Sequence, residues 1–393
     1  MTPILPPLRL TGAEILRDGE LQRRSIAIAD GRITRGPLPE VDLTGFLILP
    51  GIIDLHGDGM EHHIAPRAGA AVPLNAALAA ADREAAAHGL TTAFLAQGWS
   101  WEGGLRSPDA AEALLVALDR HRLQALTDLR VMIRAETHLV GSGARLIAAV
   151  QRHRVGYVLF ADRLEAAAET RHARPALFAA LAAGLGQDVS DLSAALDAAR
   201  ARGRDVPRHL CTLAEAFDAL GVLYGSKGDP DGETRERYSM IGARIAAFPA
   251  TRRAAAAAHA MMSPVILGAP AVLGARGPAG SVAACDLIAE GLCDALVSDG
   301  QVPALVRAAL ALVDRGLATL PEAWAMLSAN PAEILRLPDR GRLTPGLRAD
   351  LVVMRADTRE VEATICGGRL SYLAGEAGRR FLSQPQPMRM AAE

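Results

Sequence analysis

Two side chains that can bind a metal ion stand together at the end of an apolar stretch. His56 and Asp58 follow the strand-like run 52–55, which comes after a Pro-Gly turn. Side chains two residues apart on a strand point to the same side, so an imidazole and a carboxylate at this spacing can grip one cation. A strand end with a solvated His and Asp explains the same short pattern. The spacing alone leaves both interpretations open.

The strand that would carry this pair is the first of eight expected strands. From residue 49 to residue 342, strand-like runs alternate with Ala-rich helical stretches, which is the pattern of repeated βα units. Eight such units close into a TIM-type (β/α)8 barrel, an α/β fold whose chemistry lies at the C-terminal ends of the strands. After 52–56, the expected strands are 91–95, 129–135, 155–160, 220–224, 243–248, 265–268 and 295–298.

Residues at or just after those strand ends are the candidates for catalysis and ligand binding. They combine carboxylates, which bind cations and move protons, with cationic and hydroxyl side chains. Lys227 stands out among them because it is the one lysine of the chain. The full set is Glu136, Asp162, Arg163, Ser226, Lys227, Asp229, Arg252, Arg276 and Asp299.

Both ends of the chain consist of short strand-like runs separated by turns. Residues 25–31 form a strand-like run with an Asp-Gly hairpin signal, and 346–354 and 364–370 are also strand-like. Neither end is long enough to bury a core alone, so the two ends are expected to pair. We therefore expect a composite small β-domain of 1–48 and 343–382, a barrel of 49–342 with a helical insertion at about 164–217, and a tail of 383–393.

Composition limits the class of function. The 393 residues are 50% hydrophobic, and the net charge of −2 gives no basic footprint for nucleic acid. No apolar run reaches the roughly eighteen residues that a membrane span needs. The cysteines are widely spaced, which indicates reduced core thiols. We expect a cytoplasmic homo-oligomer that acts on a small molecule and binds neither nucleic acid nor a membrane.

Several motifs together resemble the amidohydrolase superfamily. They are the His-x-Asp pair after Pro-Gly, the run 297–299 on the eighth strand, and 346–352 at the return to the β-domain. Within that superfamily, 53–67 looks most like the diphosphatases that act on α-D-ribose 1-methylphosphonate 5-triphosphate in phosphonate metabolism. Further similarities to that family are 134–136, 245–251, 267–270, 280–284 and 298–299.

The resemblance implies a metal-assisted hydrolysis that releases diphosphate and leaves a 5-phosphate. By position, His56 and Asp58 would hold a divalent metal ion, with zinc as the first candidate. Glu136 would bridge two ions where two are present. Asp299 would contact the metal and accept the proton of the attacking water, because a carboxylate beside an acidified water can relay its proton.

The resemblance also suggests which side chains contact a small phosphorylated substrate. Arg67 and Arg276 could bind phosphate oxygens in the bidentate way that a guanidinium allows. His63 follows the metal motif and is a third candidate for the substrate site. A solvated surface role explains each of these residues as well.

The chain departs from the family pattern at two positions where a metal-binding histidine is expected. Arg163 stands at one of them and Lys227 at the other. Arginine is always charged and lysine normally is, so neither offers a lone pair to a cation. We therefore expect one metal ion rather than two, and we hypothesise that Lys227 and Arg163 replace the missing ion and act in catalysis. The alternative is that both point away and that His138 or His63 completes the metal shell.

Three functions fit this sequence. The first is a hydrolase that cleaves diphosphate from a ribose 1-alkylphosphonate 5-triphosphate. The second is an enzyme of the same fold with another substrate, such as a cyclic amide or a different phosphorylated sugar, because a fold does not fix a function. The third is a metal-poor homologue that binds a ligand without turnover. The similarity covers nearly the whole chain, which favours the first.

Overall fold

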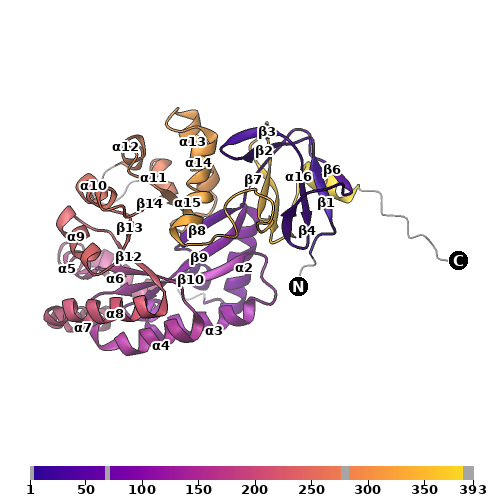
Figure 1. The fold of residues 1–393 in the computed structure, drawn as a ribbon. Helices are drawn as coiled ribbons and strands as arrows, with labels where there is room; N and C mark the ends of the chain where they lie inside the picture. Colours follow the sequence, from indigo (N-terminus) through magenta and orange to yellow (C-terminus); the bar gives the residue numbers. More distant parts are fainter. Residues whose placement is uncertain (1–3, 67–70, 276–282, 384–393) are drawn as a thin grey trace.

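The structure is a computed structural model that describes residues 4–66, 71–275 and 283–383. Within these residues, eight parallel strands lie side by side in sequence order and form a barrel (Figure 1). The α/β barrel predicted from the sequence is therefore confirmed. Its strands are β8 (Ile52–Gly57), β9 (Leu90–Trp99), β10 (Asp128–Glu136), β11 (Tyr157–Ala161), β12 (Leu223–Lys227), β13 (Ile245–Ala247), β14 (Val265–Gly268) and β15 (Ala295–Val297).

The fifth barrel strand begins later than predicted. The helix before it continues to Leu220 and ends at Gly221, whose φ of +68° is the left-handed geometry of a helix C-terminus. The strand therefore starts at Leu223 instead of residue 220. As a consequence, Ser226 and Lys227 are the last residues of β12 and do not belong to the loop after it.

The first and last barrel strands meet at a buried carboxylate. Asp54 of β8 accepts hydrogen bonds from the Ser298 hydroxyl at 2.5 Å and from the Ser298 backbone N–H at 3.1 Å. The backbone N–H of Asp299 donates to the carbonyl of His56 at 3.2 Å. These bonds hold the end of β15 beside the end of β8.

Side chains of the barrel strands alternate between two apolar layers. Phe94, Met132 and Leu159 belong to a core inside the barrel, whereas their neighbours Leu95 and Ile133 pack against the surrounding helices. This alternation follows from the two-residue repeat of a strand whose two faces are both buried. This alternation also decides whether the side chain of the last residue of each strand points into the barrel or toward the helices.

Helices follow the strands and cover the outside of the barrel (Figure 1). Many of their buried residues are alanines, such as Ala254 and Ala258, which let a helix approach the sheet closely. The helices are α1 (Met60–Ile64), α2 (Leu74–Ala87), α3 (Pro108–His121), α4 (Gly143–His153), α8 (Val206–Leu220), α9 (Gly232–Met240), α10 (Arg252–Ala260), α11 (Ala269–Val272), α12 (Ala284–Ala289), α13 (Ala304–Asp314), α14 (Leu320–Ala325) and α15 (Ala329–Ile334).

Three helices form an insertion between β11 and α8. They are α5 (Leu164–Ala173), α6 (Pro175–Gly184) and α7 (Val189–Ala201), and they share a small apolar core. Trp101, in the loop after β9, belongs to the same core as Phe178 of α6 and Leu196 of α7. The insertion is thus attached to the loops at the C-terminal side of the barrel. The last part of the predicted insertion is α8, which lies against α4.

The two ends of the chain share one β-sheet beside the barrel. In Figure 1 the first strands, in indigo, lie next to the last ones, in yellow. β7 pairs antiparallel with β16, and their six-stranded sheet has the order β18-β17-β16-β7-β2-β3. A four-stranded sheet, β5-β4-β1-β6, shares its apolar core. Because Gly51 alone separates β7 from β8, this sheet anchors the first barrel strand.

The remaining strands and the last α-helix belong to this smaller part. They are β1 (Leu8–Thr11), β2 (Glu14–Arg17), β3 (Glu20–Arg23), β4 (Ile26–Ala29), β5 (Arg32–Thr34), β6 (Glu40–Asp42), β7 (Phe46–Pro50), β16 (Leu351–Arg355), β17 (Val361–Cys366), β18 (Arg369–Leu373) and α16 (Gly375–Leu382).

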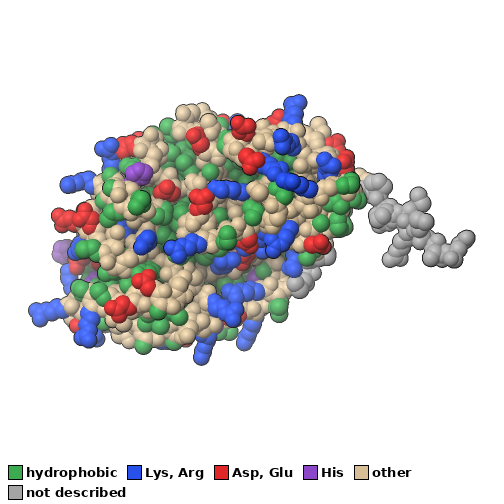
Figure 2. All heavy atoms as spheres, in the orientation of Figure 1, with side chains coloured by type: hydrophobic (Ala, Val, Ile, Leu, Met, Phe, Trp, Pro, Cys, Tyr) green, Lys and Arg blue, Asp and Glu red, His purple; other side chains and the backbone are tan. Residues whose placement is uncertain are grey.

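The surface mixes charges of both signs. On the face that Figure 2 shows, basic and acidic side chains are interspersed over the barrel and the β-domain. Among the described helices, none has the length and apolarity needed to cross a membrane. The four cysteines are free thiols, but only Cys293 and Cys366 are buried as predicted, whereas Cys285 is partly exposed and Cys211 is exposed.

Candidate functional site

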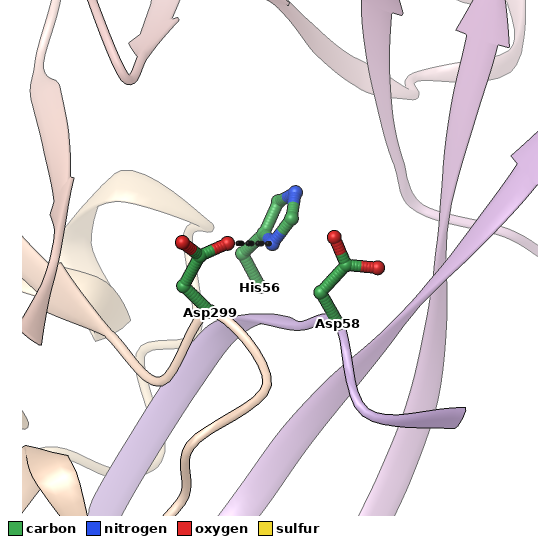
Figure 3. Close-up of side chains that lie close together, drawn as sticks. All are labelled: His56, Asp58 and Asp299. Atoms are coloured by element: carbon green, nitrogen blue, oxygen red, sulfur yellow. Dashed lines mark ion pairs between the residues drawn. The ribbon is translucent and has the colours of Figure 1, made fainter. Parts of the chain in front are cut away.

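Three of the four predicted metal ligands come together at the ends of β8 and β15. Figure 3 shows the side chains of His56, Asp58 and Asp299 close together, His56 from β8, Asp58 from the turn directly after β8 and Asp299 from the segment after β15. Each offers one ligand atom, and these atoms lie within 4.8 Å of one another. His56 Nδ1 is 4.0 Å from the nearer carboxylate oxygen of Asp299. We call these three residues the His56 group.

The backbone turn after β15 brings the Asp299 carboxylate to this group. Asp299 has a φ of +46°, a left-handed conformation that is uncommon for a residue other than glycine. Gly300 continues the turn with a φ of +83°. Backbone strain of this kind costs about 1–3 kcal/mol and is often found at functional sites.

His56 is a buried imidazole whose two ring nitrogens have different surroundings. Its side chain is 1% exposed, and burial, reinforced by the cations Lys227 and Arg134, lowers the pKa of His56 well below its usual value. Nε2 lies 3.1 Å from Lys227 Nζ, whereas Nδ1 has no hydrogen-bond partner among the described residues. A buried nitrogen without a partner, facing two carboxylates, is suited to ligate a divalent ion.

Lys227 lies directly beside the His56 group. Its ammonium contacts His56 Nε2 and stands 4.4 Å from the centre of the Phe248 ring, which favours a cation over its face. Burial, reinforced by Arg134, lowers the pKa of Lys227 to about 8, although Asp58 and Asp299 oppose the shift. The lysine therefore places a positive charge directly beside His56.

A cation that the sequence did not single out neutralises Asp58. Arg134, which is 8% exposed, donates from Nη1 to Asp58 Oδ2 at 2.5 Å, and its Nη2 lies 3.6 Å from Glu61. Arg134 is two residues before Glu136 on β10, so both side chains point to the same side. That two-residue spacing was a readable signal for its place at the site.

The fourth predicted ligand, Glu136, belongs to a different group. Glu136 ends β10 and groups with His138 and Asp162, their ligand atoms lying within 4.8 Å of one another. One of its oxygens accepts a hydrogen bond from the backbone N–H of Arg163 at 3.0 Å. Burial raises the pKa of Glu136 to about 8, and this hydrogen bond only partly opposes the shift.

The guanidinium of Arg163 points to another carboxylate. Its Nε lies 3.3 Å from Glu102, and the side chain is 45% exposed. Arg106 binds the same Glu102 at 3.0 Å and also Glu61 at 2.7 Å. The cation paired with Asp58 is therefore Arg134. Of the two cations expected to replace a metal ion, Lys227 contacts the His56 group, whereas the Arg163 guanidinium contacts Glu102.

Several other candidates make ordinary structural contacts. His63 on α1 lies 3.0 Å from Glu84 and is not part of the His56 group. Asp229 and Ser226 bind each other at 2.7 Å, and the fully buried Arg235 contacts both. The remaining assignments cannot be placed: Arg67 and Arg276, the other predicted substrate contacts, lie outside the described residues.

A cavity of about 380 Å³ opens beside these groups, at the ends of β9 to β12 and under the insertion. This volume is in the range of small-molecule pockets. A larger hollow of about 880 Å³ lies between helices α3 and α4 on the outside of the barrel, away from the strand ends. The charged residues that line the smaller cavity are Glu102, Arg106, Arg134, Glu136, Asp162, Arg163 and Lys227.

Comparison with known proteins agrees with this architecture. The profile of the amidohydrolase family matches residues 47–371. The chain belongs to the amidohydrolase family. This amidohydrolase is 28% identical over 366 residues to the alpha-D-ribose 1-methylphosphonate 5-triphosphate diphosphatase of Escherichia coli strain K12, covering 88% of this chain and 94% of that protein.

Solved structures of other amidohydrolase-like enzymes share the fold. The β-aspartyl dipeptidase of Fervidobacterium islandicum AW-1 is 16% identical with a TM-score of 0.60, covering 95% of this chain and 98% of that one. The N-acetylglucosamine-6-phosphate deacetylase of Pasteurella multocida is 11% identical with a TM-score of 0.59, covering 93% and 99%. These TM-scores show that the fold is shared. At identities this low, the likeness does not identify the substrate.

Proposed function

We propose that this amidohydrolase cleaves diphosphate from a ribose 1-alkylphosphonate 5-triphosphate with the help of one divalent metal ion, zinc being the first candidate. The reaction is suggested by the diphosphatase of Escherichia coli that the chain resembles. The observation that carries the proposal is the His56 group, in which an imidazole nitrogen that no described residue contacts by a hydrogen bond lies near two carboxylates at the ends of two barrel strands.

The donor set of the His56 group fits one ion. One imidazole and two carboxylates are ligands that zinc and related divalent ions accept, with water in an open position. A bound ion of this kind polarises a phosphate oxygen and makes a bound water more acidic. A second ion beside His56 would meet the ammonium of Lys227 and the guanidinium of Arg134, so we assign one ion to this group.

Each side chain has a role in the proposed hydrolysis. Asp299 takes the proton of the water that attacks the phosphorus atom, and burial, which raises the pKa of Asp299, makes it a better base. The oxygen that bridges the first and second phosphates leaves with the diphosphate. Lys227 and Arg134 supply positive charge where negative charge develops on the phosphate oxygens.

The substrate would enter through the cavity at the strand ends. Arg163, whose exposed side chain lines that cavity, is placed to contact the outer phosphates. Arg67, His63 and Arg276 stay predictions as substrate contacts. A homo-oligomeric state and a cytoplasmic location also stay predictions.

An assay of the purified chain tests the reaction. Protein stripped of metal and reloaded with zinc is expected to release diphosphate from ribose 1-methylphosphonate 5-triphosphate, as followed by phosphorus NMR. Asp299→Asn should lower the rate by about 10²–10⁴-fold, the usual range for a lost general base. Asp191→Asn, on an exposed helix of the insertion, is the control and should keep the rate. Hydrolysis of a hydantoin or of another phosphorylated sugar, without diphosphate release, would contradict the substrate.

One observation favours a second candidate function, a metal-poor homologue that binds ligand without turnover. The contact of Lys227 with His56 and that of Arg134 with Asp58 already balance part of the negative charge of the His56 group. In that case no divalent ion would give turnover, and calorimetry would still detect binding of the phosphorylated sugar.

A further inference from the structure

Helices α3 and α4 lie side by side at one edge of the molecule (Figure 1), and large apolar side chains are exposed there. The hollow of about 880 Å³ lies between the two helices. Val116 lines this hollow and is 40% exposed, and Leu123, just after α3, is 73% exposed. Seven residues are about two helical turns, so both side chains lie on one face. Exposed apolar groups beside a hollow mark a surface for protein contact.

The face of α3 that borders the hollow is ordered by charge. Carboxylates stand at its N-terminal end, small and apolar side chains in the middle, and a guanidinium at its C-terminal end. Their spacing of three and four residues keeps them on one side of the helix. The six residues of α3 that line the hollow are Asp109, Glu112, Ala113, Val116, Ala117 and Arg120.

Carboxylates outnumber cations at the N-terminal end of this face. Arg145 of α4 binds both Asp109 and Glu112, the latter at 2.9 Å. One guanidinium therefore serves two carboxylates, and this end of the face keeps a net negative charge.

The balance is reversed at the C-terminal end. Asp119 pairs with Arg122 at 3.1 Å and lies 2.7 Å from His153 of α4. Arg120 adds a second guanidinium, whose exposed side chain lines the hollow. Two guanidinium groups beside one carboxylate make this end of the face positive.

We propose that this face of α3 binds a second copy of the chain, with the two α3 helices antiparallel about a twofold axis at Val116. A twofold contact uses the same patch on both copies. Residues 112 and 120 are each four residues from Val116, so Glu112 meets the partner's Arg120 at both ends of the contact. A parallel arrangement would bring like charges together, so the charge order selects the antiparallel one.

The oligomeric mass of the full chain tests this surface and does not depend on the proposed reaction. Sedimentation equilibrium at micromolar concentration is expected to show a dimer for wild type. Arg120→Glu and Glu112→Arg should each raise the dimer Kd at least about tenfold, because like charges then meet twice. Arg307→Glu, at an exposed position of α13 apart from α3, is the matched control and should stay dimeric (Figure 1).

Mixing the two charge variants tests the antiparallel register. Each glutamate of the Arg120→Glu chain would then face an arginine of the Glu112→Arg chain, so an equimolar mixture should dimerise with nearly the wild-type Kd. Val116→Glu places two carboxylates at the axis and should also weaken the dimer. All three positions are exposed or half-exposed, so an unchanged thermal unfolding midpoint is expected and separates lost contact from lost fold.

Three results would overturn the inference. They are a monomeric wild type, a dimer that survives both Arg120→Glu and Val116→Glu, and a mixture of the two charge variants that stays monomeric.

Discussion

At the scale of single residues, the contact between Lys227 and His56 determines which imidazole nitrogen carries the proton. The ammonium lies 3.1 Å from His56 Nε2, and the free nitrogen Nδ1 faces Asp299. A protonated Lys227 requires Nε2 to accept its hydrogen, which places the imidazole proton on Nδ1. Metal binding at Nδ1 therefore competes with the charge on Lys227.

Lys227→Met is the direct test of that competition. Removing a cation beside the ion relieves repulsion of about 1–4 kcal/mol, so zinc affinity should rise by at least about fivefold. Loss of the same cation from the transition state should lower kcat. Calorimetry and steady-state kinetics measure the two effects, and an unchanged zinc affinity would show that Lys227 does not limit metal binding.

Glu136 should make stability depend on pH in the metal-free protein. Burial raises the pKa of Glu136 from 4.5 to about 8. Because the folded-state pKa is above the unfolded one, this group favours folding at low pH, and the advantage is lost as pH rises from about 4.5 to 8. Glu136→Gln, which stays neutral, should match wild type near pH 5 and be more stable near pH 9.

Urea unfolding at the two pH values, in the presence of a chelator, measures this difference. The gain at the higher pH should reach a few kcal/mol, at about 1.4 kcal/mol per pKa unit. An equal stability difference at both pH values would mean that Glu136 titrates normally.

The charged contacts of single residues are the part of the site that the sequence predicted least well. In the structure Glu136 and Lys227 end barrel strands, and Arg163 and Asp299 lie two residues after barrel strands, while their functional roles stay predictions. The sequence did not predict which cation pairs with which carboxylate. The partners of long side chains such as Arg134 and Arg163 lie on other strands and loops, so they depend on how these elements pack. Only coordinates give those contacts.

At the scale of elements, the junction of β8 and β15 holds the His56 group together. Ser298→Ala removes the hydroxyl that donates to buried Asp54 at 2.5 Å. The loss should cost about 1–3 kcal/mol of stability and also weaken zinc binding, because Asp299 is the next residue. Denaturant titration and calorimetry measure the two effects.

Ser371→Ala is the matched control for that variant. Ser371 donates to the carbonyl of Leu126 at 2.7 Å, far in sequence from the site. The Ser371→Ala variant should be less stable than wild type and should bind zinc with the same affinity. If Ser298→Ala leaves zinc affinity unchanged as well, the junction does not position Asp299.

The insertion is the second element with a predicted effect on function. Phe178 is the buried centre of the core that joins α6 and α7 to the loop of Trp101. Phe178→Ala should raise KM for the phosphorylated substrate, because it loosens the helices that border the cavity, and leave the metal content unchanged. Val189→Ala, at an exposed position of α7, is the control. A loss of metal with unchanged KM would contradict this role.

The elements themselves were largely predictable. Alternation of apolar and Ala-rich runs gave the order of the barrel strands, because both faces of a parallel sheet are buried. The fifth strand was misplaced because the apolar run Leu220 to Tyr224 contains the last residue of a helix, the C-terminal Gly221 and the first residues of a strand. Gly221 was the available signal for that boundary.

At the scale of the whole molecule, the chain ends stabilise the strand that carries the site. β7 pairs with β16 over five residue pairs and then runs into β8 through Gly51. The sequence predicted that the two ends would pair, since neither could bury a core alone. The order of the strands in the two sheets required coordinates, because short strands of similar composition have many possible partners.

We propose that the His56 group binds one divalent ion at the mouth of the amidohydrolase barrel. Anomalous X-ray diffraction at the zinc edge, from crystals soaked in zinc, tests it most directly. A zinc peak is expected within bonding distance of His56 Nδ1, Asp58 and Asp299, with Lys227 outside the coordination shell. A zinc-soaked crystal with no peak among these three residues would contradict it.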